Sequence, residues 1–257
     1  MNLAYPTVVG CMKSIQWSSS NIMWWQTAEL QRRIRSILFL WAGFAAAALL
    51  WTLCCGDLAD VALVARAPWV VAFHEQLRWL NAWSMYPFYV FFIGMLLWGW
   101  QRQQPQWRLL SWGYLIAQLA GSVLLVRSLK MLIGHARPDF NNLRSELADR
   151  WVGPTSDASF HGFPSGHTTD LFISAIFLSV LLPKAWMRGL VLAFAAFNGV
   201  LRIALAKHYP LDVLGGVLLG GLVALLVLRF WVVPRLQGYE VRAATVPTVR
   251  GTEPGMI

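Results

Sequence analysis

LDVLGGVLLGGLVALLVLRFWVV, residues 211–233, is an almost uninterrupted apolar stretch in which only Asp212 and Arg229 carry a charge. A helix needs roughly 17 to 25 residues to cross a bilayer core of about 30 Å, and this stretch is long enough. The sequence therefore predicts a membrane-spanning helix here, with a carboxylate close to its first turn.

Five segments that precede this stretch also have the length and apolar character of membrane spans. Their expected limits are 36–55, 82–100, 109–129, 168–183 and 186–206. Two of them are weak, since the second is short and carries Pro87 and the fourth begins with Thr168, Thr169 and Asp170. We expect an all-α fold, a bundle of six transmembrane helices.

The composition agrees with a membrane protein. Of the 257 residues, 57% are hydrophobic and 13% are charged, and the mean hydropathy is +0.52. That is more apolar surface than one soluble core can hide. A tryptophan-rich soluble core is the weaker alternative, because the amphipathic ring of Trp, present 15 times, favours the membrane interface. Residues 1–35 contain no cleavable signal peptide, so we expect the first span to remain as a signal anchor.

The net charge of +9 does not predict a nucleic-acid partner. The basic residues are scattered between apolar stretches and form no stripe or arm. The three cysteines, Cys11, Cys54 and Cys55, follow neither a disulfide framework nor a zinc pattern. Positive loops and an anionic ligand explain the charge better.

The distribution of basic residues predicts the orientation in the membrane. With a cytoplasmic N-terminus, 12 of the 21 Lys and Arg residues lie inside. These are Lys13, Arg32, Arg33, Arg35, Arg102, Arg108, Lys184, Arg188, Arg229, Arg235, Arg242 and Arg250. The expected organisation is a cytoplasmic segment at 1–35, a six-helix membrane domain at 36–233 and a cytoplasmic tail at 234–257.

Two longer connections lie outside in this topology. The first has apolar residues at helical spacing and polar residues opposite them, which predicts an interfacial amphipathic helix lying flat on the outer surface. The apolar set is Val70, Phe73, Leu77 and Leu80, and the polar set is His74, Glu75, Arg78 and Asn81. The second connection, about 130–167, is rich in Gly, Pro, Asp, Asn and Ser, and loops of this length are often functional.

Polar clusters lie at the outer ends of the last four spans, at 130–138, 164–167, 202–208 and Asp212. An up-and-down topology brings these ends to one face of the bundle. The clusters contain one Lys, two Arg, two His, one Ser and one Asp that we expect to converge there. Ionisable groups at the mouth of a helix bundle are costly and usually functional.

Three motifs fall within these clusters. KMLIGHARP (130–138) has Lys, six residues and Arg-Pro; FPSGH (163–167) carries Pro-Ser-Gly-His; RIALAKHYPLD (202–212) has Arg, five residues, His, three residues and Asp. In this order they resemble the signature of the type 2 phosphatidic acid phosphatase (PAP2) family, in its membrane-integral lipid phosphatase branch, whose active site is related to that of vanadium haloperoxidases. The resemblance covers roughly 109–233, and Leu201 departs from it because the family often has Ser there.

A phosphate site fits the chemistry of these residues. Phosphoryl transfer spreads negative charge over the phosphate oxygens, so preorganised donors stabilise it. Lys130, Arg137 and Arg202 are the expected cationic donors. Ser165 and Gly166 precede the fourth span, where free N–H groups favour an anion. No metal or other cofactor is then expected. Taken alone, Lys130 and Arg137 could be juxtamembrane charges and Ser165 a helix cap.

The resemblance also implies roles in catalysis. His208 would be the nucleophile that attacks phosphorus, and Asp212 would hold its imidazole in the reactive tautomer. His167 would be the general acid that protonates the leaving group, and water would then hydrolyse the phosphohistidine.

Three further ionisable residues near the motifs have no assigned role. His135 and His161 occupy no motif position, and each is a minor candidate for contact with the substrate. Asp170 lies three residues after His167, so it shares a helix face with that imidazole. It could tune His167 or pair with a neighbouring Arg.

The resemblance implies an integral membrane phosphatase of the plasma (inner) membrane, with cytoplasmic termini and a site facing the periplasm or cell exterior. Its partners would be the bilayer and a lipid phosphomonoester or diphosphate, namely phosphatidic acid, phosphatidylglycerol phosphate or undecaprenyl diphosphate. A lipid A phosphatase and a lipid phosphotransferase are alternatives with the same site. A non-catalytic phospholipid binder or transporter is an alternative of another class. The sequence predicts no oligomeric state.

Overall fold

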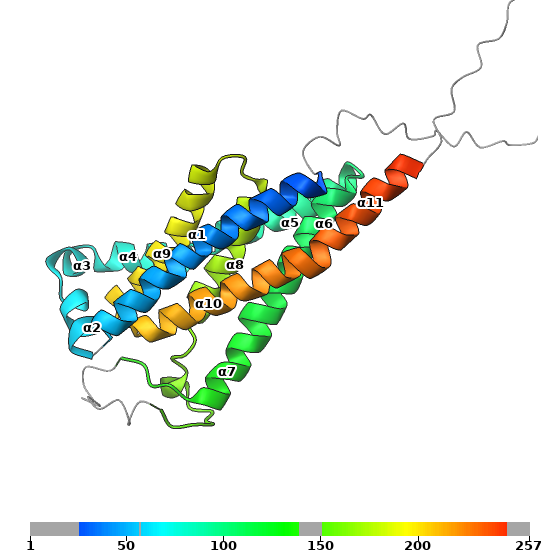
Figure 1. Ribbon diagram of the computed structural model, residues 1–257. Helices are drawn as coiled ribbons and strands as arrows, with labels where there is room; N and C mark the ends of the chain where they lie inside the picture. Colours follow the sequence, from blue (N-terminus) through cyan, green and yellow to red (C-terminus); the bar gives the residue numbers. More distant parts are fainter. Residues whose placement is uncertain (1–25, 57, 139–150, 246–257) are drawn as a thin grey trace, which may run out of the picture.

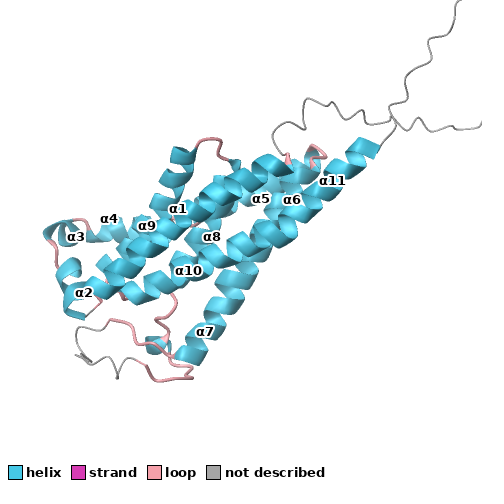
Figure 2. Cartoon of the chain, in the orientation of Figure 1, coloured by secondary structure: helices cyan, strands magenta, loops and turns pink. Residues whose placement is uncertain are grey.

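The computed structural model describes residues 26–56, 58–138 and 151–245, and this part of the chain is helical without a strand (Figures 1 and 2). The helices are α1 (Thr27–Cys54), α2 (Leu58–Ala65), α3 (Pro68–Ala72), α4 (His74–Trp83), α5 (Tyr86–Gln101), α6 (Pro105–Ala117), the π-helix η2 (Gln118–Leu125), α7 (Val126–Ile133), the short 3-10 helix η4 (Ala158–Phe160), α8 (Gly166–Leu181), α9 (Ala185–Ala204), α10 (Pro210–Val227), the π-helix η5 (Leu228–Val232) and α11 (Val233–Thr245). The predicted all-α class is confirmed.

Five described helical runs are long and apolar enough to cross a membrane. They are Thr27–Cys54, His74–Gln101, Pro105–Ile133, Ala185–Ala204 and Pro210–Arg242. The sixth apolar segment, Gly166–Leu181, has 16 residues. Each run overlaps an expected span, and the protein is a multi-pass membrane protein. Helix α1 begins nine residues before the expected span, since hydropathy detects the apolar part of a helix and not its polar extension.

The two ends of the described chain lie at the same end of the bundle (Figure 1). The backbone N–H of Thr27 donates to Glu240 Oε1 at 2.7 Å, and the Thr27 hydroxyl donates to Glu240 Oε2 at 2.7 Å. The loop that follows α7 lies at the opposite end (Figure 1). Outside the described residues lie most of the expected cytoplasmic segment at 1–35, the last part of the tail at 234–257, and the positions Cys11, Lys13, Arg144, Arg150 and Arg250.

Helix α8 occupies the centre of the bundle, with most of its side chains buried. It packs closely against α10 because glycines of α10 face it. A Cβ atom at Gly216 would lie 2.7 Å from the Ser165 carbonyl oxygen, and one at Gly220 would lie 2.5 Å from the Thr169 carbonyl oxygen. Small residues at a helix interface allow such an approach of two backbones. The start of α8, where the second motif lies, is thereby held against α10.

The outer connection before α5 differs in detail from the expected amphipathic helix. Helices α3 and α4 occupy the predicted region, but Asn81, assigned to the polar outer face, is 2% exposed. Phe73, assigned to the apolar face, is 56% exposed. An apolar side chain of an interfacial helix faces lipid and is exposed in the protein alone, so only the assignment of Asn81 was wrong. The reason is that α4 packs against α9, where the Asn81 amide bonds the carbonyl oxygen of Asn198 at 3.3 Å.

Candidate active site

The turn between α9 and α10 builds the centre of the site. It carries His208, and its last residue, Tyr209, precedes Pro210 in the first turn of α10. Asp212 Oδ2 accepts a hydrogen bond from the Tyr209 backbone N–H at 2.9 Å and lies 3.2 Å from His208 Nδ1. His208 is 1% exposed and Asp212 is fully buried. The Asp212 carboxylate therefore both caps the N-terminus of α10 and fixes the orientation of the His208 imidazole.

The environment of His208 keeps its imidazole neutral. Burial lowers the pKa of His208 to about 4, and the positive charges of Arg202 and Lys130 act in the same direction, against the opposing effect of Asp212. At neutral pH the ring thus carries one proton. A carboxylate only accepts hydrogen bonds, so this proton lies on Nδ1 and leaves a lone pair on Nε2. That is the form required of a nucleophile.

The start of α8 is tied to the same turn. The Ser165 backbone N–H donates to the Asp212 carbonyl oxygen at 2.8 Å, and the Thr168 hydroxyl donates to Ser165 Oγ at 3.0 Å. Ser165 is fully buried, and Gly166 begins the helix. His167 Nε2 lies 3.1 Å from the Ser84 hydroxyl. Ser84 follows α4, so this helix contacts the proposed general acid.

The three expected cations approach the centre from separate segments. Arg202 Nη1 donates to Asn81 Oδ1 at 3.1 Å, while its buried Nε has no hydrogen-bond partner among the described residues. Lys130 Nζ donates to the His161 carbonyl oxygen at 2.9 Å. Arg137 is exposed, and its backbone N–H donates to the Ser159 carbonyl oxygen at 3.0 Å. Guanidinium donors left free in this way suit a phosphate oxygen.

Electrostatic contacts join these groups into one cluster. Lys130 interacts with Arg137, Arg202 and Asp212, and Arg202 interacts with Arg137. His167 interacts with Arg202 and with His208. The structure therefore brings the three motifs together, as the order of the spans predicted.

The sequence did not predict two residues that contact the site, one in α4 and one directly after it. Asn81 contacts Arg202 and Ser84 contacts His167, yet neither belongs to a motif. Asn81 had been placed with the polar residues on the outer face of the helix, and Ser84 had not been considered.

His135 was named only as a minor candidate, but its Nδ1 lies 2.7 Å from Asp212 Oδ1. The ring of His161 instead contacts the Thr155 carbonyl oxygen, with Nε2 at 3.2 Å. Of the three residues left without a role, His135 is thus the one bonded to the Asp212 carboxylate.

Asp170 has neither of the two partners suggested from sequence. Its carboxylate accepts hydrogen bonds from the Tyr89 hydroxyl and from Gln118 Nε2, the latter at 3.2 Å, and the Ser122 hydroxyl lies 3.4 Å away. These donors come from α5 and η2. Asp170 therefore belongs to a polar cluster inside the bundle, where it joins α8 to its neighbours.

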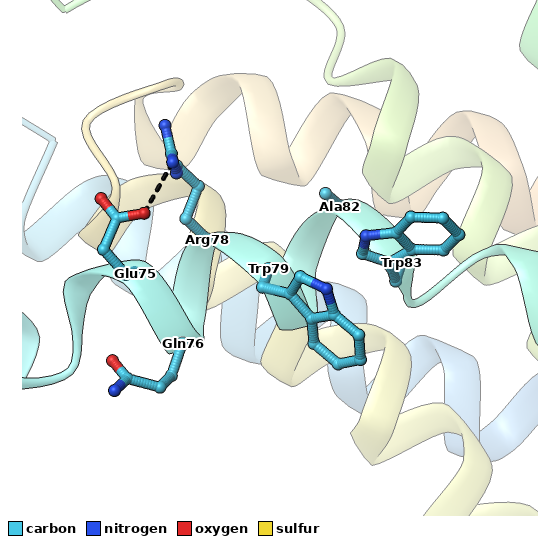
Figure 3. A pocket seen from close by; sticks show the side chains of 6 residues that line it. All are labelled: Glu75, Gln76, Arg78, Trp79, Ala82 and Trp83. Carbon is cyan, nitrogen blue, oxygen red and sulfur yellow. Dashed lines mark hydrogen bonds and ion pairs between the residues drawn. The ribbon is translucent and has the colours of Figure 1, made fainter.

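A surface hollow on α4 lies apart from these contacts. It is lined by Glu75, Gln76, Arg78, Trp79, Ala82 and Trp83 (Figure 3). Arg78 Nη2 is bonded to Glu75 Oε2 at 2.6 Å (Figure 3). None of the motif residues lines this hollow, so it is not the phosphate site.

Comparisons with known proteins agree with the motifs. Residues 110–235 match the model of the PAP2 superfamily. A lipid A 1-phosphatase of Rhizobium etli is 34% identical over 128 residues, which are 49% of this chain and 53% of that protein. The bacitracin transport permease protein BcrC of Bacillus licheniformis is 51% identical over 79 residues, 30% of this chain and 36% of that protein. The chain thus spans about half the length of the first of these relatives, and less of the second.

A crystal structure of a transmembrane PAP2 type phosphatidylglycerolphosphate phosphatase from Bacillus subtilis superimposes with a TM-score of 0.45 at 22% identity, covering 85% of this chain and 99% of that one. The family assignment comes instead from the sequence match, which contains all three motifs. Through residues 110–235, this chain belongs to the PAP2 superfamily.

Proposed function

We propose that the protein is an integral membrane lipid phosphatase that hydrolyses a phosphomonoester or diphosphate of a lipid through a phosphohistidine. The observation that carries the proposal is the buried Asp212–His208 pair, which interacts with Lys130 and Arg202 at one end of the bundle. An anion binder needs the cations alone, whereas an oriented neutral imidazole is a nucleophile.

The proposed reaction has two steps. His208 Nε2 attacks phosphorus, a P–N bond forms, and the bond to the leaving oxygen breaks as His167 donates a proton to it. Water then attacks the phosphohistidine, His167 takes a proton from that water, and the P–N bond breaks to release inorganic phosphate and neutral His208. Lys130, Arg137 and Arg202 would stabilise the charge on the transferred group, as would the Ser165 hydroxyl and the N–H group of Gly166. No step requires a metal or another cofactor.

The fold supports a proposed topology of six crossings, with α8 as the short fourth one. The described ends then lie on one side, the cytoplasm, and the site on the other, the periplasm or cell exterior. The even number of crossings agrees with Thr27 and Glu240 being neighbours. Helix α4 would lie at the outer interface, since Trp79 and Trp83 are 65% and 52% exposed. The membrane would be the plasma (inner) membrane.

The candidate substrates are phosphatidic acid, phosphatidylglycerol phosphate, undecaprenyl diphosphate and lipid A. Lipid A belongs in this set because the Rhizobium etli relative is named for its 1-phosphatase activity. The alternative class is a non-catalytic phospholipid binder or transporter, and the Bacillus licheniformis relative is named as a transport permease protein. Turnover separates the two classes, since a transporter leaves the phosphate ester intact.

The test is release of inorganic phosphate from this panel by the purified protein in excess chelator. We expect release from at least one lipid, and we expect His208→Ala to lower it by about a thousand-fold or more while lipid binding is retained. His74→Ala is the matched control, because this His lies on α4 with an exposed side chain. Transfer of phosphate to a second lipid in place of water would identify a phosphotransferase. Full activity of His208→Ala would refute the mechanism.

A further inference from the structure

The carboxylate that orients His208 also binds a second imidazole. Asp212 Oδ1 lies 2.7 Å from His135 Nδ1, and Asp212 Oδ2 lies 3.2 Å from His208 Nδ1. Oδ2 also accepts the Tyr209 backbone N–H at 2.9 Å. Each oxygen thus faces its own histidine, and the contact with His135 is the shorter of the two. Because an ionised carboxylate only accepts, His135 must carry its proton on Nδ1.

His135 is itself held in place. It is 2% exposed, and its ring lies against Trp151 with centroids 4.1 Å apart and against Tyr209 with centroids 5.5 Å apart. Its carbonyl oxygen accepts the Gly162 N–H at 2.7 Å. The donor that faces Oδ1 is therefore fixed by packing on two sides. A group held by its neighbours is suited to orient another.

We propose that His135 is a positioning residue for the phosphoryl transfer, holding the Asp212 carboxylate in the rotation that presents Oδ2 to His208. The inference rests on the proposed function for its catalytic meaning. If the His135 donor were removed, Asp212 Oδ1 would stay buried but lose this hydrogen bond, which is energetically costly for a carboxylate oxygen. Rotation of the carboxylate toward other donors relieves that cost and withdraws Oδ2 from His208.

A purely structural role for His135 would be to attach the loop after α7 to the bundle. The main chain already does this, since residue 135 makes backbone bridges to Trp151 and His161. The Thr155 N–H also donates to the Met131 carbonyl oxygen at 2.9 Å. These main-chain contacts persist when only the side chain of residue 135 changes. Among the described contacts, the polar partner of the His135 side chain is Asp212.

Two substitutions separate the roles. His135→Asn places an amide donor near the position of Nδ1, whereas His135→Leu fills much of the same space without a donor. We expect His135→Leu to lower kcat roughly 10- to 100-fold, a typical cost of losing an orienting partner, with KM changed less than about two-fold. His135→Asn should retain kcat within about three-fold of the unchanged protein. His74→Gln, an exposed histidine on α4, is the control that should leave both constants unchanged.

A second readout does not depend on turnover. The chain has five histidines, so ¹⁵N-histidine labelling gives a small set of ring signals, assigned by single substitutions. His208 should be the Nδ1–H tautomer in the unchanged protein and in His135→Asn, and a mixture of tautomers in His135→Leu. If His135→Leu fails to fold, the test rests on His135→Asn alone. Loss of the Nδ1–H tautomer of His208 in a folded His135→Asn protein would contradict the inference.

The inference is overturned if His135→Leu keeps both kcat and the tautomer, or if His135→Asn is as impaired as His135→Leu. A failure of the proposed function would be recognised by a different result, namely that the unchanged protein hydrolyses none of the lipid phosphates. The tautomer of His208 would then still report whether His135 positions Asp212.

Discussion

At the scale of single residues, one buried carboxylate organises the proposed catalytic centre. Asp212 caps α10 through the Tyr209 N–H and is bonded to two imidazoles. Removing a buried carboxylate would leave these donors unpaired, which costs more than the bonds themselves contribute. The proposed nucleophile, its orientation and the start of α10 therefore depend on the same side chain.

The low pKa of His208, about 4, predicts how stability depends on pH. The unfolded chain takes up a proton at this residue below about pH 6.5, whereas the folded protein does so only near pH 4. Stability is thus complete above pH 6.5 and declines as the pH falls toward 4, by at most about 1.4 kcal/mol per pH unit from this group. Melting temperatures in detergent of the unchanged protein and of His208→Gln measure this directly. The decline should be shallower in the variant, and parallel curves would contradict a buried neutral His208.

The motifs predicted the charged members of the candidate site because the proposed chemistry requires fixed residue types at fixed spacings. Asn81, Ser84 and His135 were not identified as site residues, since their roles depend on tertiary contacts. Asn81 is informative, because its buried position follows from how α4 packs on α9, which spacing within α4 does not determine.

At the scale of elements, the contact between α8 and α10 positions the turn that we propose binds phosphate. The Ser165 N–H donates to Asp212 O at 2.8 Å, so the two helix starts are bonded where the second and third motifs meet. Gly216 lies one turn further along α10 and allows the backbones to approach. A shift of either helix moves Ser165 relative to His208.

Gly216→Ala should damage both stability and activity. The added Cβ would lie 2.7 Å from a backbone oxygen that cannot rotate away, so the helices must separate. Overpacking of this kind costs roughly 1–3 kcal/mol. Gly189→Ala in α9 is the matched control, since its Cβ meets nothing within 4 Å and a helical Gly→Ala change is expected to be neutral or stabilising. Thermal unfolding and phosphate release measure the two effects, and equal behaviour of the two variants would show that this packing does not position the site.

Hydropathy predicted the positions of the apolar helices but not their full lengths. The last span was expected to end at 233, yet helix continues through η5 and α11 to Thr245. Polar residues such as Gln237 and Glu240 end an apolar pattern without ending a helix. The π-helices η2 and η5 could not be predicted from hydropathy either, because a turn widened by one residue has the same apolar composition as the α-helix around it.

At the scale of the whole molecule, the proposed topology of six crossings would place all the motifs on one side of the membrane. This can be checked with single cysteines in a background where Cys11, Cys54 and Cys55 are replaced by Ser. Ser156→Cys, in the loop after α7, should react with a membrane-impermeant thiol reagent added outside intact cells. Gln103→Cys and Lys184→Cys should react only after permeabilisation, because they lie in the connections at the other end. Labelling of all three from one side would contradict six crossings.

The charge of the whole chain fits this arrangement. The basic residues behind the net charge of +9 are scattered along the chain, and three of them, Lys130, Arg137 and Arg202, interact with one another. The expected order of the spans predicted that these three would converge, since alternate crossings would bring the ends of the last four spans to one face.

The most direct test of the account is to trap the covalent intermediate. The purified protein would be mixed with a ³²P-labelled lipid phosphate that it hydrolyses, quenched in alkali within milliseconds, digested and analysed by mass spectrometry. We expect an acid-labile, alkali-stable phosphoryl group on His208, and we expect it to be absent from His208→Ala. It should accumulate in His167→Ala when the leaving group of the substrate needs no protonation, because the water that hydrolyses the phosphohistidine then lacks its base. A phosphoryl group on another residue, or full turnover with no phosphoenzyme at any time point, would contradict it.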